Sequence, residues 1–523
     1  MTSFKISTYE DIPVETPVEE IPSLVARVKA GYTSYKTLPL SFRREQLRNL
    51  YYALYDNQDL LYQTLMQDLH KCPHEINMME TFQTFTEILW LIENLDDLAA
   101  PKPIPGSPLA LKLASIRLTR QAFGTVLIIS PWNYPIVLSV LPIASALAAG
   151  NTIVYKPSEM CEHTSRALVK ILSEALDPSV FVSITGGVPQ STAVLKLPFD
   201  KIMYTGNGVV GRIVARAAAE HLTPTILELG GKSPVVVTAT ANLKIAARRI
   251  LWGKRANAGQ TCVAPDYLLV DKKVHKDFLA ALKVAYHEFN AGLTAESHDD
   301  YSDIINGRHF ARIKAYLDNT KGSVVLGGNY DEKTLFFPTT IVDGVTASDS
   351  LLKEEIFGPL LGIITYTELS EAVNFITSEH DTPLALYIFS TSKREQNFIL
   401  DRVRCGGVSI NETLMHLTAP QAPFGGVGES GHGAYHGING FRAFSHERTV
   451  LSQPAIVESA LNVRYPPYSL SKSKQYNLMS GPPANPYPRE GPVVVGGVFK
   501  QLLSKGLWVV VLLVGLVYSR KFW

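Results

Sequence analysis

Short apolar runs that alternate with helical stretches begin after Arg120, and they constrain the fold more than any other feature of this chain. The runs occupy residues 126–129, 153–155, 181–184 and 201–204, and helical stretches such as 138–149 and 164–175 separate them. Strands buried on both faces are apolar throughout, and parallel strands need a crossover that is usually a helix. The pattern therefore predicts βαβ units and a parallel sheet with helices on both faces.

A second alternating series follows Gly230 and predicts a separate α/β domain. Before the first series, residues 21–97 carry apolar side chains at three- and four-residue intervals, which indicates helices. Prolines between residues 101 and 105 end this region. A chain of 523 residues is long enough for two or three such domains, so the predicted fold class is α/β.

Two segments with alternating polar and apolar residues, 107–122 and 440–453, lie outside both series. We expect them to pair as strands of a third, smaller element. From Pro466 to about Pro492 the composition shifts to Ser, Lys, Pro, Gly and Asn without a sustained period, which is typical of a linker.

The C-terminal segment is the most apolar part of the chain. Residues 506–519 are fourteen positions without a charge, fewer than the roughly 20 that a straight helix needs to span a bilayer. Lys500 and Lys505 can extend their charged ends toward water, which lengthens the usable stretch back toward Val493. We expect a C-terminal membrane anchor; an apolar contact between subunits, or insertion into one leaflet, is the alternative.

Composition excludes several classes of function. The net charge of +1 leaves no electrostatic signal for nucleic acid, and no nucleic-acid partner is expected. The four cysteines show no paired spacing, so neither a disulfide framework nor a zinc site is indicated, and a reducing compartment is expected. The acidic N-terminal stretch resembles neither a signal peptide nor a transit peptide.

One cysteine and one carboxylate have the sequence context of a catalytic pair. Cys262 follows a small, flexible Gly-Gln-Thr approach, and Glu228 ends an apolar run just before Gly230. A thiol nucleophile and a base brought together by folding would support covalent catalysis on a carbonyl. The alternatives are a buried inert thiol for Cys262 and a salt bridge for Glu228.

Three loops after predicted strands are candidates for binding. Asn133, in a loop braced by two prolines and two aromatic residues, could donate to an oxyanion or could belong to a rigid packing turn. Gly206, Gly208 and Gly211 spell GxGxxG where a strand runs into a helix, which suits a pyrophosphate but also any tight α/β turn.

Lys156 and Glu159 end another predicted strand, where they could bind the ribose hydroxyls of a cofactor or simply begin a solvated helix. His432, His436 and His446 lie in a glycine-rich segment without acidic or cysteine ligands beside them, so no metal site is predicted there or elsewhere.

Together these motifs resemble the aldehyde dehydrogenase superfamily over about residues 20–465. The motifs that carry the resemblance are Pro-Trp-Asn-Tyr-Pro at 131–135, Lys-Pro-Ser-Glu at 156–159, Leu-Glu-Leu-Gly-Gly-Lys at 227–232, Gly-Gln-Thr-Cys at 259–262 and Glu-Glu-Ile-Phe-Gly-Pro at 354–359. Residues 423–428 and 433–448 look like the class 3 branch, which includes fatty aldehyde dehydrogenases. With its apolar tail, the chain most resembles the fungal fatty aldehyde (hexadecenal) dehydrogenases.

The resemblance implies a role for each matched residue. Cys262 is the implied nucleophile and Glu228 the general base, while the Asn133 amide and the Cys262 backbone N–H bind the oxyanion. The implied cofactor-binding residues are Trp132, Lys156, Glu159, Gly206, Asn207, Gly211, Glu355 and Phe357. Lys156 is expected on the adenine ribose, Glu355 on the nicotinamide ribose and Phe357 beside the ring. The cofactor is expected to be NAD, with NADP possible, because the charge of Glu159 opposes a 2′-phosphate.

The resemblance also implies the domain plan. A Rossmann-type dinucleotide-binding domain would comprise residues 1–106 and 123–229, and the catalytic domain residues 230–435. Bridging strands would lie in residues 107–122 and 436–462, the linker in 463–492 and the membrane anchor in 493–523. A homodimer is expected.

The implied function is NAD(P)-dependent oxidation of long-chain fatty aldehydes such as hexadecenal to fatty acids, through a cysteine thiohemiacetal and thioester. The enzyme would be membrane-anchored and face the cytosol, on the mitochondrial outer membrane, the endoplasmic reticulum or a lipid droplet. Alternatives are a class 3 enzyme for aromatic or medium-chain aldehydes, an acyltransferase using Cys262, and an inactive membrane scaffold.

The chain departs from the family's pattern in two places. The family's usual GxxxxG turn here has Asn207 and an extra Gly208. The segment after Tyr465 is rich in proline, which disfavours the gatekeeping helix of membrane-bound relatives.

Overall fold

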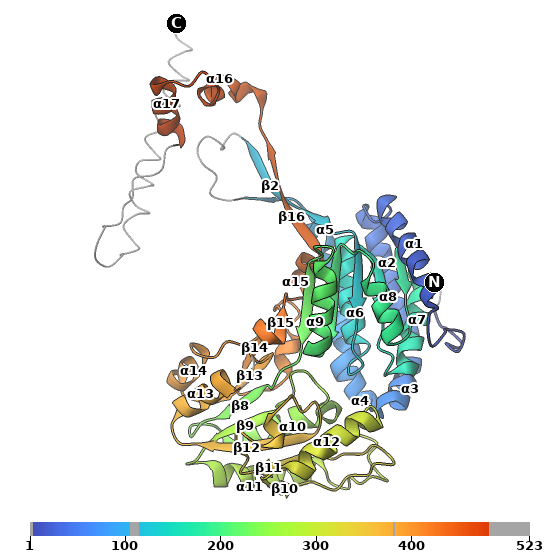
Figure 1. The fold of residues 1–523 in the computed structure, drawn as a ribbon, viewed down its shortest axis with the longest axis vertical. Coiled ribbons are helices and arrows are strands. Elements are labelled where there is room, and N and C mark those ends of the chain that lie inside the picture. The colour runs from blue at the N-terminus through green and yellow to red at the C-terminus, as the bar shows by residue number, and fades with distance from the viewer. Residues whose placement is uncertain (1–3, 105–113, 380–381, 481–523) are drawn as a thin grey trace. The chain divides into compact units, whose positions relative to one another are not determined.

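The computed structural model describes residues 4–104, 114–379 and 382–480 (Figure 1). The chain divides into two compact units. The first comprises Met1–Pro101 and Thr119–Arg448, and the second comprises Lys102–Leu118 and Thr449–Trp523. The predicted anchor, residues 493–523, lies outside the described residues.

The N-terminal region is helical, as its apolar spacing predicted. Its main helices are α1 (Ile21–Thr33), α2 (Leu40–Asp56), α3 (Gln58–Leu69) and α5 (Phe82–Ala99), with short α4 (Pro73–Ile76) and a π turn (Asn77–Thr81) between the last two. In α2 the buried residues Leu47, Leu50 and Leu54 recur every three or four positions and form the inner stripe of an amphipathic helix.

In the described part of the first unit, six strands form one sheet in the order β15-β7-β6-β3-β4-β5. Their bounds are β3 (Thr125–Ile129), β4 (Thr152–Lys156), β5 (Phe181–Ser183), β6 (Lys201–Gly206), β7 (Thr225–Leu229) and β15 (Gly431–His432). Strands β3 to β7 pair in parallel, which confirms the predicted βαβ units, while β15 pairs antiparallel with β7 at the edge.

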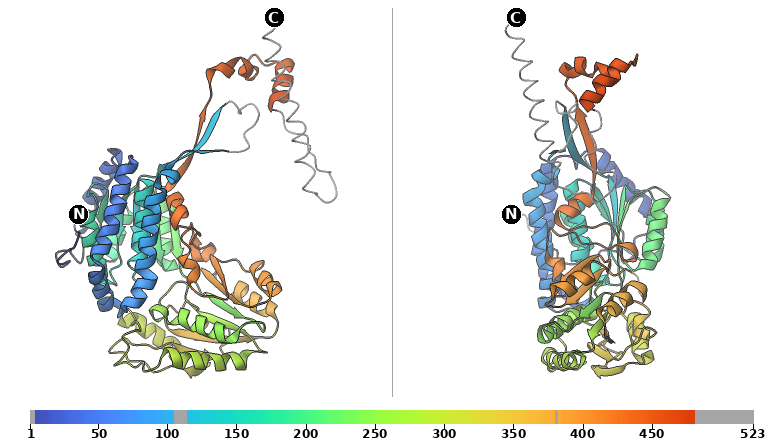
Figure 2. Two further views of the ribbon diagram at one scale, coloured as in Figure 1. Left: turned by 180° about the vertical axis from the view of Figure 1, so that it is seen from behind. Right: turned by 90° about the vertical axis from the view of Figure 1, so that its left-hand side faces the viewer.

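Helices cover both faces of this sheet (Figure 1, Figure 2). Leu127 points into a core with α1, α8 (Val188–Leu195) and α9 (Gly208–Ala219). Its neighbours Val126 and Ile128 point into the opposite core with α2, α5, α6 (Val137–Ala149) and α7 (Glu162–Ala175). Since successive side chains of a strand face opposite ways, both sets must be apolar. This is the physical reason for the continuous apolar runs.

Seven strands of the described residues form a second sheet, in the order β10-β11-β12-β9-β8-β13-β14. Their bounds are β8 (Pro234–Val237), β9 (Tyr267–Asp271), β10 (Ser323–Leu326), β11 (Thr340–Asp343), β12 (Leu360–Tyr366), β13 (Ala385–Phe389) and β14 (Gly407–Ile410). All neighbours are parallel except β10 and β11. The helices of this lobe are α10 (Leu243–Arg255), α11 (His275–Phe289), α12 (Gly307–Asn319), α13 (Leu369–Glu379) and α14 (Lys393–Leu400).

A third sheet joins the two alternating segments, as expected from the sequence. Among the described residues it has the order β1-β2-β16, formed by Lys102–Pro103, Ser115–Ala122 and Ser445–Ser452. The Thr119 hydroxyl donates to the Arg448 carbonyl at 3.2 Å. Residues 107–113 of the first predicted segment lie outside the described residues.

Helix α17 (Leu470–Ser480) lies in the second unit, inside the segment that the sequence predicted as a linker. Its apolar residues Leu470 and Leu478 are exposed, so it has no buried stripe that a periodicity argument could detect. In the ranges that the structure describes, no helix is both long and apolar enough to cross a membrane.

Candidate active site

The carboxyl ends of the parallel strands of the first sheet gather most of the predicted site residues. The loop with Trp132 and Asn133 follows β3, Lys156 ends β4, Gly206 ends β6 and Glu228 lies near the end of β7. In a parallel sheet these ends share one edge, which is where α/β folds bind their ligands.

The segment before Cys262 has an unusual backbone. After α10, Asn257, Ala258 and Gly259 take left-handed conformations, with φ of 52°, 50° and 72°. A Cβ on Gly259 would overlap the carbonyl oxygen of Gly358, so this approach needs a residue without a side chain. Such consecutive outliers are costly and are typical of functional loops.

Gln260 connects the Cys262 loop to Asn133. The Asn133 side-chain amide donates to the Gln260 carbonyl at 3.0 Å. The Gln260 side chain is fully buried, donates to the Asp303 carbonyl at 2.9 Å and accepts from the Ile305 N–H at 3.0 Å. Because a side-chain amide nitrogen carries two hydrogens, Asn133 keeps a second N–H that can point at an oxyanion.

A buried ion pair between Lys71 and Glu80 holds the backbone of Asn133 in place. Lys71 Nζ donates to the Asn133 carbonyl at 2.9 Å and to Glu80 Oε1 at 2.8 Å, and both charged side chains are fully buried. Glu80 Oε2 accepts from the Ile136 N–H at 2.8 Å. Sequence reasoning did not identify this pair; the available signal was a Lys and a Glu inside an apolar helical region, where a charge is expensive unless paired.

Glu228 is buried, with only 2% of its surface exposed. Its Oε2 accepts from the Thr205 hydroxyl at 3.2 Å. Burial raises the pKa of Glu228 to about 7, opposed by the charge of His436 and by the hydroxyls of Thr205 and Tyr435. A carboxyl group with this pKa is suited to general base work near neutral pH.

Cys262 lies within electrostatic reach of two carboxylates. Burial raises the pKa of the Cys262 thiol well above its usual range, and the charges of Glu228 and then Glu355 raise it further. Its own N–H and that of Val263 act in the opposite direction. The structure therefore brings Cys262, Glu228 and Glu355 together, and it ties Asn133 to the same loop.

His436 pairs with Glu87, a buried residue of α5 that the sequence reasoning did not find. His436 Nδ1 lies 3.0 Å from Glu87 Oε2, and the Gly437 N–H donates to Glu87 Oε1 at 2.8 Å. The rings of Tyr435 and His436 stack with centroids 4.4 Å apart. By contrast, His432 contacts the Thr225 hydroxyl at 2.7 Å and His446 lies beside Phe123, so these three histidines have separate partners.

The glycine-rich turn has two functions in the fold. Asn207 caps α9 by accepting from the Val210 N–H at 2.9 Å, which leaves its amide hydrogens available. A Cβ on Gly206 would overlap the Tyr204 hydroxyl, and one on Gly211 would lie 2.6 Å from a methyl of Leu229. Gly211 therefore lets α9 pack closely on β7, and the N-terminus of α9, with the dipole's positive end, can receive a phosphate.

Lys156 is 2% exposed, and burial lowers the pKa of its ammonium group. Its Nζ donates to the Pro157 carbonyl at 2.9 Å and lies 3.4 Å from Glu159 Oε2. The Glu159 side chain is half-exposed. Lys156 and Glu159 thus form an ion pair, and their charged groups can also bind ribose hydroxyls.

Glu355, from the lobe of the second sheet, lies against Gly230, which directly follows β7 of the first sheet. A Cβ on Gly230 would overlap Glu355 Oε2, so the carboxylate occupies the space of the missing side chain. Burial, with the charge of Asp266 second, raises the pKa of Glu355 to about 8. Asp266 also accepts from the Ile356 N–H at 2.9 Å and pairs with Lys232, which holds the loop in place.

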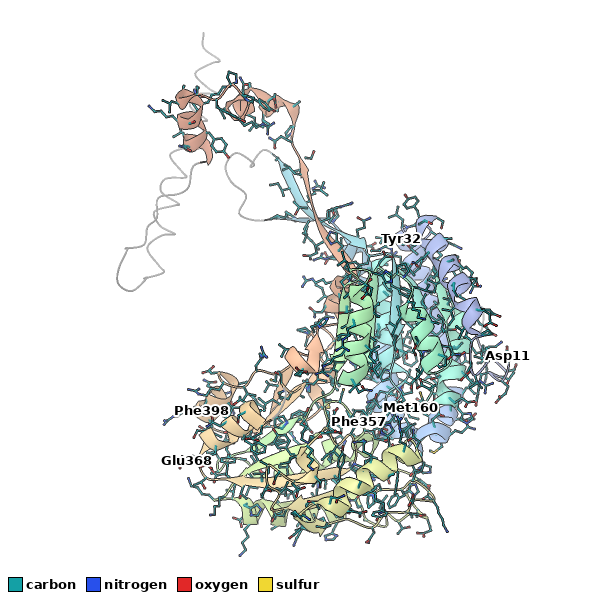
Figure 3. All side chains as sticks on the ribbon, in the orientation of Figure 1. Asp11, Tyr32, Met160, Phe357, Glu368 and Phe398 are labelled. Carbon is teal, nitrogen blue, oxygen red and sulfur yellow. The ribbon has the colours of Figure 1, made fainter. Side chains whose placement is uncertain are left out.

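Phe357, labelled in Figure 3, completes this side of the site with a left-handed φ of 45°. Its ring makes an edge-to-face contact with Trp132, with centroids 5.4 Å apart. Trp132 comes from the same loop as Asn133. The glycine-rich turn, the N-terminus of α9 and a carboxylate at Gly230 together fit a dinucleotide.

Comparison with known proteins gives the family. The sequence model of the "Aldehyde dehydrogenase family" matches residues 8–450. "Beta-apo-4'-carotenal oxygenase" of Neurospora crassa is 41% identical over 503 residues, which cover 96% of this chain and 94% of that protein. "Aldehyde dehydrogenase family 3 member A2" of Pongo abelii is 41% identical over 448 residues, which cover 86% of this chain and 91% of that protein.

A solved structure agrees with these relatives. The substrate-bound state of Staphylococcus aureus AldH superposes with a TM-score of 0.85 at 38% identity, covering 88% of this chain and 99% of that one. Since the family match and these similarities extend over most of the residues, the chain belongs to the aldehyde dehydrogenase family, is similar to its class 3 branch, and is an NAD(P)-dependent oxidoreductase.

Proposed function

We propose that this aldehyde dehydrogenase oxidises long-chain apolar aldehydes, such as hexadecenal, to carboxylic acids with Cys262 as nucleophile and Glu228 as base. The observation that supports the catalytic roles is that three groups meet. Burial and the charge of the Glu228 carboxylate raise the pKa of the Cys262 thiol, and the Asn133 side chain is hydrogen-bonded to Gln260 in the same loop as Cys262.

The first chemical step is attack of the Cys262 sulfur on the aldehyde carbon. The thiol is protonated at rest, so its proton must leave as the bond forms, and Glu228 is the base within reach. The carbonyl oxygen becomes an oxyanion, which the free N–H of Asn133 and the Cys262 N–H stabilise. The tetrahedral species is a thiohemiacetal on Cys262.

A nicotinamide held by Glu355 and Phe357 would supply the acceptor for the hydride that leaves this carbon. What remains on Cys262 is a thioester. Glu228 releases the proton that it took from Cys262 to solvent and then takes one from a water molecule, whose oxygen attacks the thioester carbon. This proton passes to the departing sulfur, so that the acid and the thiol are released. The same carboxylate therefore serves both steps, and the pKa of about 7 lets it cycle between its two forms.

For the cofactor we propose NAD rather than NADP. Lys156 and Glu159 would bind the adenine ribose, Asn207 with the N-terminus of α9 the pyrophosphate, and Glu355 the nicotinamide ribose. The support is the carboxylate of Glu159, half-exposed beside Lys156, where a 2′-phosphate would meet a like charge. Lys156 offsets part of this repulsion.

The substrate and the membrane belong together in the proposal. The apolar C-terminal sequence suits anchoring to the cytosolic side of the mitochondrial outer membrane, the endoplasmic reticulum or a lipid droplet. The carotenal in the name of the Neurospora crassa relative is a long apolar aldehyde, which favours this substrate class over aromatic or medium-chain aldehydes. The intact Cys262 and Glu228 pair opposes the inactive scaffold. We also propose a homodimer.

Truncation after Pro492 tests the proposal. We expect the shortened enzyme to leave the membrane fraction while keeping its activity on a short soluble aldehyde, since every proposed catalytic residue precedes Tyr465. On hexadecenal embedded in vesicles it should lose at least about tenfold in kcat/KM, because each buried methylene contributes roughly 0.8 kcal/mol to partitioning into lipid.

A full-length control variant distinguishes the loss of membrane anchoring from the mere loss of residues. Val511→Lys with Leu513→Lys places charges in the apolar stretch and should reproduce the truncated enzyme. Retention of the truncated form in membranes after carbonate extraction would contradict the anchor. Equal losses on short and long aldehydes would instead assign the tail to folding or dimerisation.

A further inference from the structure

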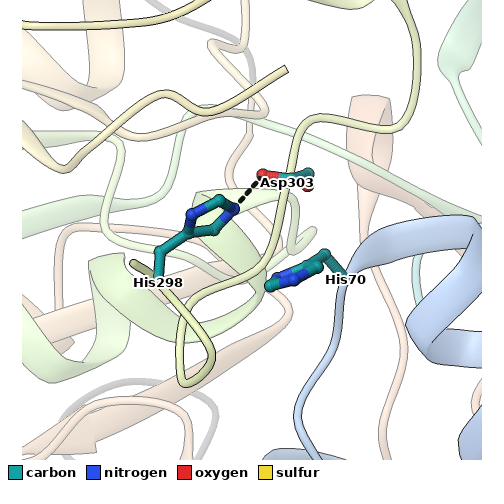
Figure 4. A group of neighbouring side chains, drawn as sticks. All are labelled: His70, His298 and Asp303. Atoms are coloured by element: carbon teal, nitrogen blue, oxygen red, sulfur yellow. Dashed lines mark hydrogen bonds and ion pairs between the residues drawn. The ribbon is translucent and has the colours of Figure 1, made fainter. Parts of the chain in front are cut away.

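Two imidazoles and a carboxylate from distant segments meet beside the Gln260 loop (Figure 4). His70 follows α3 with a left-handed φ of 51°, while His298 and Asp303 lie in the connection between α11 and α12. His298 Nε2 lies 3.0 Å from Asp303 Oδ1, and the rings of His70 and His298 have centroids 4.5 Å apart. One ligand atom from each of the three residues lies within 4.8 Å of the others.

The surroundings orient these groups as ligands. The Tyr301 carbonyl lies 3.2 Å from His70 Nδ1, and because a carbonyl only accepts, this nitrogen carries the proton and Nε2 keeps its lone pair. A backbone carbonyl in this position is the usual partner of a metal-binding imidazole. The Asp303 N–H donates to the Leu69 carbonyl at 2.9 Å, which fixes the loop next to His70.

We propose that His70, His298 and Asp303 bind a divalent transition-metal ion, for which Zn²⁺ is the best match. Zinc binds nitrogen and carboxylate oxygen at about 2.0 to 2.2 Å in tetrahedral geometry, so two ligand atoms on one ion lie about 3.4 Å apart. Side-chain rotations that close the present spacing by at most about 1.4 Å are sufficient, and water fills the fourth position.

The ion would stabilise the loop that holds Gln260. The Gln260 side chain donates to the Asp303 carbonyl and accepts from the Ile305 N–H. A metal on Asp303 would therefore be bound by a residue that directly contacts the loop before Cys262. It would also join α3 to this loop by bonds stronger than the present hydrogen bonds. This inference does not depend on the proposed substrate, because metal binding is measured without turnover.

Titration of the full-length chain with Zn²⁺ tests the site. The Cys262→Ser variant is the background, since the catalytic thiol could bind zinc on its own. We expect one equivalent of Zn²⁺ by calorimetry and a higher unfolding temperature with zinc present. Asp303→Asn and His298→Asn, added to this background, should each weaken Zn²⁺ binding by at least about tenfold.

His275→Asn is the matched control. His275 forms a similar pair with Asp343 at 2.8 Å, for which the described residues provide no third ligand. Its removal should leave Zn²⁺ binding unchanged. Binding of Co²⁺ should show no thiolate charge-transfer band, which excludes the nearby Cys72 as a ligand.

Several outcomes would overturn the site. They are the absence of a stoichiometric ion, equal weakening by His275→Asn, or a thiolate band that disappears with Cys72→Ser. Unfolding temperatures measured without metal identify a variant that fails to fold, and His70→Gln then provides an independent test. Unchanged Zn²⁺ affinity in folded His70→Gln and Asp303→Asn proteins also contradicts the proposal.

Discussion

The chemistry of the site rests on two buried acids whose pKa values are both raised. Cys262 and Glu228 are close enough for the charge of Glu228 to oppose formation of the thiolate, and both groups are desolvated. At a given pH each group is therefore protonated to a larger extent than a solvent-exposed group of the same kind. One proton must pass from sulfur to carboxylate as the bond forms, which makes the protonation state of Glu228 the controlling variable.

The pH dependence of turnover follows from this carboxylate. Glu228 is active as a base only when deprotonated, so thioester hydrolysis should fall about tenfold per unit as the pH drops below the pKa of about 7, and level off above it. Steady-state kcat for a short soluble aldehyde at saturating NAD checks this. Glu228→Gln should flatten the profile. A wild-type profile that does not change near neutral pH would exclude this role.

His436 should adjust that midpoint. Its charge lowers the pKa of Glu228, so His436→Asn is expected to move the midpoint upward by about 1 unit and to reduce kcat at neutral pH. His432→Asn is the control, because His432 contacts the Thr225 hydroxyl instead. If both variants shift the midpoint equally, the effect of His436 is structural rather than electrostatic.

At the scale of elements, substitutions at the adjacent glycines Gly230 and Gly231 can distinguish the contact of Glu355 with the cofactor from tight packing of the turn. Gly230→Ala would place a methyl group where Glu355 lies, whereas at Gly231 the nearest atom, the Leu384 nitrogen, is 3.4 Å from the added Cβ. We expect Gly230→Ala to raise the KM for NAD by at least about tenfold, the loss of a hydrogen bond to a charged group. Gly231→Ala should stay near wild type in the same assay.

The alternative outcome at these glycines is informative. Equal effects of both substitutions would mean that the turn, and not Glu355, sets the affinity for the cofactor. A Glu355→Gln variant with unchanged KM for NAD would contradict the assignment of this carboxylate directly.

The elements that the sequence predicted are those with a clear period. Strands β3, β4 and β6 are buried on both faces, so their apolar runs were visible. The sequence reasoning missed β10, β11 and β12 and the helices α12, α13 and α14. Strand β10 is short and largely exposed, so it shows no clear apolar run. Strand β12 is a mostly buried apolar run that the sequence reasoning overlooked.

At the scale of the whole molecule, motifs gave the names of the site residues but not the contacts between them. The pair of Glu87 and His436 joins positions 349 apart in sequence, and Asn133 meets Gln260 across 127 positions. No local pattern encodes such partners, because they depend on how the two sheets pack. The same holds for His70, His298 and Asp303, which sequence spacing did not bring together.

The central claim is that Cys262 carries the substrate while Glu228 activates the water, and trapping the acyl-enzyme tests it most directly. Full-length Glu228→Gln is mixed with NAD and hexadecenal, reduced cofactor is followed by absorbance, and the digested protein is analysed by mass spectrometry. The predicted result is a slowed burst of about one reduced cofactor per chain, because water must then accept the thiol proton, followed by a stall with the acyl group on Cys262. Cys262→Ser should show neither signal. Acylation of Cys72, Cys161 or Cys405 instead, or steady turnover without a burst, would contradict the account.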